Sequence, residues 1–247
     1  MIKQIYYFGS FNPFHIGHRM VATVVSDYFY GCKVYIAPSP CSPFKNKADM
    51  IPIEKRIEII EACIEGVPNM EFSGIDIAVG GDKPNHYTYE TLEVIKMQYE
   101  GDSKEIGILI GSDELAVFDK WKNWEWIMDN FTVIVYPRVG DPINMLLEKF
   151  PKVVLGTAYY ENEFVPQKIG AAEPNNLTRE QLEHMKDTTR FEDATKYTVV
   201  SKQPYLYFEY SATEMREKLK HFKENYKELC CMYNDKALKI LAEIYDK

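Results

Sequence analysis

Short apolar runs alternate with amphipathic segments along most of the chain. The runs are rich in Ile, Val and Tyr, as buried strands are, and the segments between them repeat their apolar positions at helical spacing. Strands are predicted at residues 4–8, 33–37, 71–79, 106–110, 132–136, 153–155 and 205–209. Helices are predicted at residues 16–30, 52–65, 89–99 and 212–229, with a short helix after Asp141-Pro142 and a terminal helix from Asn234. The alternation predicts an α/β fold with a doubly wound parallel sheet.

The alternation stops between residues 157 and 203, where the sequence is polar and its helical periodicity is poor. We interpret 157–203 as an insertion before the last predicted strand, within a single domain that spans residues 1–247. Residues 211–247 then supply the C-terminal helices. The insertion is expected either to cover a site or to build a contact between copies of the chain in a homo-oligomer, and its sequence decides neither.

Composition narrows the class of protein. The chain has 247 residues, of which 46% are hydrophobic, which is enough for a sizeable core. A formal net charge of −8 argues against nucleic acid or an anionic membrane as a partner, because either would need a broad surface of lysine and arginine. Five cysteines without C-x-x-C spacing indicate neither a disulfide framework nor a zinc site, and we expect no role for Cys230-Cys231. With no candidate leader or membrane span, we expect a cytoplasmic protein.

The most informative segment follows the first predicted strand and reads Gly-Ser-Phe-Asn-Pro-Phe-His-Ile-Gly-His from Gly9 to His18. Gly17 permits a close backbone approach at the start of a helix, where unpaired N–H groups attract anions. His15 and His18 are close enough in sequence for both rings to face one point and donate hydrogen bonds to phosphate oxygens. The segment therefore predicts a phosphate-binding turn. The alternative is a turn with two solvated or capping histidines.

This segment resembles the opening of the H-x-G-H nucleotidyltransferases, and most of all the G-S-F-[DN]-P-x-H-x-G-H of nicotinate or nicotinamide mononucleotide adenylyltransferases. Phe8 and Phe14 depart from the usual pattern, in packing more than in charge. The resemblance implies a Rossmann-like nucleotidyltransferase fold. It also implies transfer of AMP from ATP, with Mg²⁺ bound to the ATP, to the pyridine mononucleotide, which gives deamido-NAD or NAD and pyrophosphate. Implied nucleotide contacts are Gly9, Ser10, Phe11, Gly17 and His18 for ATP, and Asn12 for the mononucleotide.

A second matching segment, Ser211-Ala212-Thr213-Glu214-Met215-Arg216, follows the last predicted strand. Ser211 and Glu214 form a good capping box, which by itself explains both residues. The segment is also similar to the family's [IS]-S-x-T-x-x-R signature. This similarity implies that Ser211, Thr213 and Arg216 bind the ATP phosphates.

Two other basic residues, Lys45 and Arg56, are further candidates for contacts with phosphate. Lys45, in Pro43-Phe44-Lys45, lies where the family carries P-H-K, and the match implies a second cation for the triphosphate. Without the match, Lys45 is a surface lysine. Arg56 is expected to be a surface charge on its helix, with a phosphate contact as the alternative.

Three stretches resemble the substrate side of the family. Residues 85–92 look like P-S-Y-T-x-x-T-L, which implies that Tyr87 and Thr88 border the pyridine ring. Residues 110–113 match I-G-x-D at the carboxyl end of a strand, where open α/β sheets bind ligands. The match implies contacts of Gly111 and Asp113 with the nucleotide, whereas Ser112 can be explained as a helix cap. The resemblance further implies that Trp121 stacks on the pyridine. We add the hypothesis that Lys122 helps to hold a nicotinate carboxylate.

The implied mechanism needs no general base, because the attacking phosphate is already anionic. The implied catalytic residues, which stabilise charge on the transferring and leaving phosphates, are His15, His18, Lys45 and Arg216. Alternatives are a pantetheine-phosphate adenylyltransferase or cytidylyltransferase with the same opening, a class I aminoacyl-tRNA synthetase, for which the chain is short and acidic, and a nucleotide-binding regulator without catalysis.

Overall fold

The computed structural model describes residues 1–40, 50–81, 83, 85–138, 142–156 and 212–246. In this part of the chain, a six-stranded parallel sheet has the order β3-β2-β1-β4-β5-β6. The strands are β1 Gln4–Gly9, β2 Lys33–Pro38, β3 Met70–Phe72, β4 Ile106–Gly111, β5 Thr132–Tyr136 and β6 Val154–Leu155. The winding direction reverses between β1 and β4. In open α/β sheets ligands bind at such a reversal, outside the carboxyl ends of the strands.

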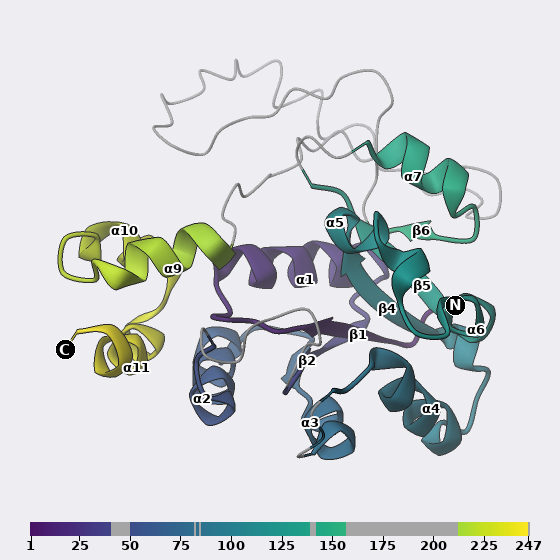
Figure 1. The fold of residues 1–247 in the computed structure, drawn as a ribbon, viewed down its shortest axis with the longest axis horizontal. Helices are drawn as coiled ribbons and strands as arrows, with labels where there is room; N and C mark the ends of the chain where they lie inside the picture. The colour runs from purple at the N-terminus through teal and green to yellow at the C-terminus, as the bar shows by residue number, and fades with distance from the viewer. Residues whose placement is uncertain (41–49, 82, 84, 139–141, 157–211, 247) are drawn as a thin grey trace.

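Helices connect the strands and cover the sheet (Figure 1). They are α1 Ile16–Tyr28, α2 Ile53–Ile64, α3 Ile75–Gly80, α4 Thr88–Gln98, α5 Ser112–Leu115, α6 Trp124–Asn130, α7 Ile143–Lys149, α9 Ala212–Lys220, α10 Tyr226–Met232 and α11 Asp235–Tyr245, with single 3₁₀ turns at Ser103–Glu105 and Phe118–Lys120. The C-terminal helices α9 to α11, drawn in yellow, gather at one end of the molecule.

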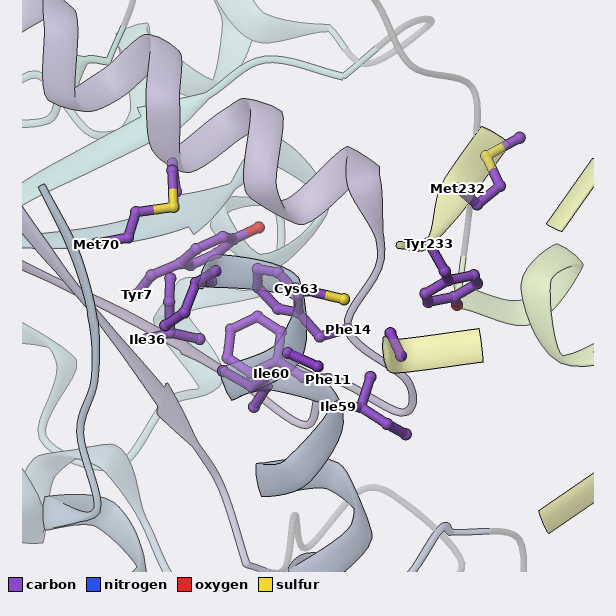
Figure 2. Close-up of a cluster of buried hydrophobic side chains, with 14 of the residues drawn as sticks. Tyr7, Phe11, Phe14, Ile36, Ile59, Ile60, Cys63, Met70, Met232 and Tyr233 are labelled. Carbon is purple, nitrogen blue, oxygen red and sulfur yellow. The ribbon is translucent and has the colours of Figure 1, made fainter. Parts of the chain in front are cut away.

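Strand alternation divides the core into two clusters. On one face, Ile5, Tyr7 and Ile36 pack with the apolar sides of α1 and α2 and with the C-terminal helices. On the other face, Ile108 and Val133 pack with α4, α6 and α7. Figure 2 shows the first cluster, in which the turn after β1 places two phenylalanines beside α2. Successive strand residues therefore bury side chains on both faces, as expected for a sheet covered on both sides.

The predicted fold class and most elements are confirmed, with two corrections. The strand predicted at 71–79 ends at Phe72, and 75–80 is helical. The Ser73 hydroxyl accepts a bond from the amide of Ile75, which favours a helix start although the apolar positions alternate like those of a strand. The helix predicted at 212–229 is broken into α9 and α10, because the Asn225 amide bonds the carbonyls of Lys218 and His221 and closes a turn between them.

Other expectations fall outside the described residues or were incomplete. The strand at 205–209, the insertion at 157–203 and Asp141 lie outside the described part of the chain. The helix α6, residues 124–130, was not predicted from the sequence. Its two tryptophans pack against aromatic rings of other elements, Trp124 against Phe150 and Trp126 against Tyr89.

Candidate active site

The turn after β1 is shaped by the contact between Gly9 and Phe11. A Cβ on Gly9 would lie 3.0 Å from two atoms of the Phe11 ring, so a larger residue at position 9 would have to displace this ring by a few tenths of an ångström. Phe11 itself has φ of 41°, in the left-handed region that a bulky residue rarely adopts. Surrounding packing stabilises the conformation, because Phe11 makes edge contacts with Tyr7 and Phe14. The turn thereby delivers the chain to the start of α1.

His15 and His18 are fixed by the backbone at the start of α1. Nδ1 of His15 accepts a hydrogen bond from the Gly17 amide at 3.1 Å, and Nδ1 of His18 accepts one from the His15 amide at 3.3 Å. Together these bonds form a reciprocal capping box. The ring centroids are 3.9 Å apart. Because each Nδ1 is an acceptor, each neutral ring carries its proton on Nε2. The capping role that the sequence offered as an alternative is therefore present, and the donation of both rings to a phosphate stays a prediction.

The His15 ring is buried and neutral. Burial, together with the smaller effect of the nearby positive charge of Arg138, lowers the pKa of His15 from 6.5 to about 3. The Nε2 atom of His15 is buried and has no hydrogen-bond partner among the described residues. A buried polar atom without a partner is costly, and a ligand that accepts a hydrogen bond would remove this cost.

Aromatic rings hold His18 in place. Phe14 stacks on the His18 ring with centroids 5.3 Å apart, and Phe11 meets it edge-on at 5.2 Å. Tyr7 completes the surroundings at 6.3 Å. The bulky Phe14, a departure from the usual pattern, is fully buried and serves as a wall for the histidine.

Arg216 joins the C-terminal helices to this turn. Its guanidinium donates one bond to the backbone carbonyl of Asn12 at 3.0 Å and another to the hydroxyl of Thr213 at 3.0 Å. Asn12 is buried, and its side-chain oxygen accepts a bond from the Ile51 amide at 2.8 Å. The two matching segments therefore meet in space, although they lie at opposite ends of the chain.

The carboxyl end of β4 contributes a charged pair. Asp113 forms an ion pair with Arg138 at 3.0 Å, and both side chains are about half exposed. Gly111 leaves room for this pair, since a Cβ there would lie 2.3 Å from the Asp113 carboxylate. Ser112 is not a helix cap as first expected, because its hydroxyl accepts a bond from the Arg138 amide and Gly111 precedes the helix. Arg138 was missed from the sequence. The clue in the sequence was its position: Arg138 follows β5, and β5 pairs with β4, the strand that ends at Gly111.

Arg56 is buried, which corrects the expectation of a surface charge. Its side chain is 2% exposed and donates to four backbone carbonyls, those of Ile51, Ser10, Ser39 and Pro40. Burial lowers the pKa of Arg56 to about 10, so it stays protonated at neutral pH. The arginine thus fixes the loops that follow β1 and β2. Its helical face was the signal, because it shares the spacing of Ile59, Ile60 and Cys63.

The expected mononucleotide side forms a second group of residues. Tyr87 is the residue before α4, and Thr88 is its first residue. The ammonium of Lys122 lies 4.7 Å from the centre of the Tyr87 ring and 3.3 Å from the Glu90 carboxylate. Trp121 is partly buried, with its ring centre 5.1 Å from that of Phe118. The structure therefore brings Tyr87 and Lys122 together.

Lys45 and Ser211 lie outside the described residues. Among the residues that are described, no cluster of three or more His, Cys, Asp or Glu side chains is arranged to hold a metal ion. None of the described helices has both the length and the apolar character needed to cross a membrane.

A sheet of this order, with paired histidines at the start of the first helix and an arginine that reaches the turn before them from the C-terminal helices, defines a nucleotidyltransferase of the H-x-G-H type. The chain belongs to the cytidylyltransferase-like family, whose model matches residues 6–234.

The curated relatives and solved structures that resemble this chain include several nicotinate mononucleotide adenylyltransferases. A protein of Porphyromonas gingivalis named probable nicotinate-nucleotide adenylyltransferase is 36% identical over 138 residues, which are 56% of this chain and 68% of that protein. A protein of Cytophaga hutchinsonii with the same name is 33% identical over 152 residues, 62% of this chain and 76% of that one. The fold is similar to that of Plasmodium falciparum nicotinic acid mononucleotide adenylyltransferase complexed with NaAD, with a TM-score of 0.67 at 16% identity, covering 100% of this chain and 98% of that one.

Proposed function

We propose that the protein transfers the adenylyl group of ATP to nicotinate mononucleotide, giving deamido-NAD and pyrophosphate in NAD biosynthesis. The observation that carries the proposal is the pair of neutral histidines with both Nδ1 atoms occupied by backbone amides, next to the arginine of the second matching segment. The relatives named nicotinate-nucleotide adenylyltransferase support the choice of acceptor.

The proposed reaction is an in-line displacement at the α-phosphorus of ATP. A phosphate oxygen of the mononucleotide forms the new P–O bond, the bond between the α- and β-phosphates breaks, and pyrophosphate leaves with the electron pair. The Nε2–H groups of His15 and His18 donate hydrogen bonds to phosphate oxygens as charge shifts toward the leaving group. Arg216, with Thr213 and Ser211, holds the triphosphate, and Lys45 and Arg138 add positive charge to the phosphate path.

Magnesium enters this scheme with its nucleotide. The described site offers Asp113 as a carboxylate, and Arg138 already pairs with it, so the described residues supply no metal cage there. Mg²⁺ keeps several waters and is commonly carried by substrate phosphates, which fits such a site. When bound with ATP, it neutralises phosphate charge.

Lys122 is the proposed source of preference for nicotinate. It lies over Tyr87 and beside Glu90, at the segment proposed to border the pyridine with Thr88 and Trp121. A carboxylate on the pyridine would give the ammonium of Lys122 a second anionic partner beside Glu90, whereas a carboxamide would not. Lys122→Ala is therefore expected to lower kcat/KM for nicotinate mononucleotide about tenfold while leaving the nicotinamide substrate nearly unchanged. Lys120→Ala, at an exposed lysine two positions earlier, is the matched control, and an unchanged substrate ratio in Lys122→Ala would remove this role.

Two wider features remain part of the proposal. Residues 157–203 form an insertion in a single domain, either over the site or at a contact between copies of the chain. The cytoplasm is the proposed compartment, in keeping with four free thiols among the described residues, Cys32, Cys63, Cys230 and Cys231.

The test is pyrophosphate release from ATP with nicotinate mononucleotide, nicotinamide mononucleotide and phosphopantetheine in parallel. Release with the first, less with the second and none with the third is expected. Release with phosphopantetheine alone would indicate the pantetheine-phosphate enzyme, and the same assay with CTP in place of ATP checks for a cytidylyltransferase. ATP binding without release on any acceptor would indicate a regulator and would overturn the proposal.

A further inference from the structure

A buried polar network lies directly beside the proposed pyridine-binding segment. His86 has a side chain that is only 1% exposed, and its two ring nitrogens face two carboxylates. Nε2 lies 2.8 Å from Asp76 of α3, and Nδ1 lies 3.2 Å from Glu90 of α4. The Thr91 hydroxyl donates to the same Asp76 oxygen at 2.5 Å and lies 2.8 Å from Nε2. His86 therefore links α3 to α4, and the next residue in the chain is Tyr87.

The surrounding backbone is shaped to hold the His86 ring. A Cβ on Gly80 would lie 3.1 Å from the ring and 2.7 Å from Pro40, so glycine at this position leaves the space that the ring occupies. Pro40 in turn gives its carbonyl to the buried Arg56. The ring is thus packed between α3, α4 and the loop that follows β2.

Two carboxylates around one imidazole favour the ring with both nitrogens protonated. Only an imidazolium donates from Nδ1 and Nε2 at once. Once the proton is lost, one nitrogen presents a lone pair to a carboxylate, and one of the two bonds becomes a repulsion. The other charged groups in this network are Lys83 and Lys122, both within 3.3 Å of Glu90. Glu90 therefore connects His86 to the lysine proposed to contact nicotinate.

We propose that His86, as an imidazolium bound to Asp76 and Glu90, is a positioning residue for the mononucleotide half of the site, and that mononucleotide binding weakens when His86 loses its proton. This inference rests on the proposed function, because the segment it positions is the one assigned to the pyridine. The ATP half, built from α1 and α9, does not include this network.

The electrostatics of the cluster agree with this geometry. Burial by itself lowers the pKa of His86, but the hydrogen bonds and charges of Asp76 and Glu90 outweigh burial and raise the pKa above 6.5. For Glu90, burial raises the pKa, and the bonds from Lys122, Lys83 and His86 outweigh burial and lower it. The protonated state of His86 thus extends toward neutral pH.

The first measurement is the titration of His86 in the intact protein by imidazole NMR. The chain has five histidines, so the His86 signal is identified by its absence in His86→Asn. A midpoint above the ordinary 6.5 is expected. Glu90→Gln removes one carboxylate and should lower the midpoint, whereas Glu93→Gln, on the same helix but bonded to Tyr89, should leave it in place. A midpoint at or below 6.5 would overturn the proposal. Where His86→Asn fails to fold, the His86 signal is assigned as the one that persists when each of the other four histidines is replaced in turn by Asn.

The second measurement is KM for each substrate across about pH 6 to 9, the range in which a raised histidine titrates. The KM of the wild type for nicotinate mononucleotide should rise about tenfold through the NMR midpoint, with KM for ATP unchanged. The mononucleotide phosphate also titrates near about pH 6, so the profile is read as the ratio of wild type to His86→Asn. His221→Asn, at an exposed histidine, is the matched control.

Three results separate the possible failures. A ratio that is flat with pH, or a His86→Asn defect confined to kcat or shared equally by the KM for ATP, would refute the positioning role. Absence of pyrophosphate release from the wild type with every mononucleotide would refute the proposed function instead. In that case the NMR midpoint still reports on the His86 network.

Discussion

The substitution His15→Asn separates the structural role of His15 from its proposed chemical role. The Nδ1 atom of His15 caps α1 by accepting from the Gly17 amide, while Nε2 is the unpartnered donor. The Asn side-chain oxygen can replace Nδ1 as the cap acceptor, because Asn is among the best N-cap residues. Asn has no counterpart of Nε2. The variant therefore keeps the helix start and loses the hydrogen bond proposed to reach phosphate.

The two effects differ in size. Loss of one donor aimed at developing negative charge lowers kcat by about 10²–10³, equivalent to about 3–4 kcal/mol. The structural cost is the ring contact with His18, whose centroid is 3.9 Å away, and such contacts contribute about 1 kcal/mol. For a protein of this size that cost is a fall of about 2–4 °C in Tm. His15→Ala also removes the cap, which costs about 1 kcal/mol more.

The assay is pyrophosphate release at saturating substrates, together with thermal unfolding of wild type, His15→Asn and His15→Ala. Both variants should lose turnover to the same extent, and only His15→Ala should lose the additional stability. Turnover of His15→Asn within about threefold of wild type would refute the donor role, because it corresponds to less than about 1 kcal/mol. Equal stability of the two variants would refute the capping role.

Three further predictions concern the surroundings of this turn. The folded chain keeps His15 neutral down to a pKa of about 3, whereas the unfolded chain protonates it near 6.5. The contribution of His15 to the free energy of unfolding should therefore fall by about 1.4 kcal/mol per pH unit as the pH is lowered from 6.5 toward 3. The free energy of unfolding, measured by urea unfolding at each pH, should fall less steeply with falling pH in His15→Asn than in the wild type. An equal pH dependence in the two proteins would show that His15 is not its cause. Arg216→Gln should lower kcat/KM about 100-fold in the pyrophosphate assay, while Lys220→Gln on the same helix should not; equal effects would point to a general change in α9. Arg56→Met should lower the free energy of unfolding by about 3–5 kcal/mol, because four carbonyls lose a charged donor. Lys55→Met, at a partly exposed lysine, should cost about 1 kcal/mol or less in the same urea titration, and a small loss for Arg56→Met would contradict the bridging role.

The sequence predicts the sheet well because most of its strands are short, nearly continuous runs of apolar residues. β1, β2, β4 and β5 begin at their predicted residues, since the sheet is covered on both faces and most strand positions after the first residue are apolar. Prediction fails where tertiary contacts decide the conformation. The alternating residues 75–79 become helical, and the apparent long helix at 212–229 is broken by the side-chain bonds of Asn225.

The histidine pair could be predicted because its two residues lie three positions apart in one short segment, a specific spacing that the sequence shows directly. The meeting of Arg216 with the turn after β1 followed from family resemblance alone, since no local pattern reports a contact between segments 204 positions apart. Arg138, Arg56 and His86 were missed for the same reason. Each acts through residues on other elements, and a single basic residue on a helix or loop is most often a surface charge.

Burial sorts the basic groups of the site by what they can do. A fully buried cation must satisfy its donors within the protein, and Arg56 does so with backbone carbonyls, which leaves it to shape loops instead of binding substrate. His15 is equally buried, and none of the described residues places an anion beside it, so it stays neutral and retains a donor without a charge that would need compensation. Arg138 remains about half exposed, where its charge is hydrated at little cost. In the proposed reaction, a triphosphate would therefore meet charge at the rim and uncharged, fixed donors at its reacting centre. Donors fixed in this way favour a transition state over the bound substrate.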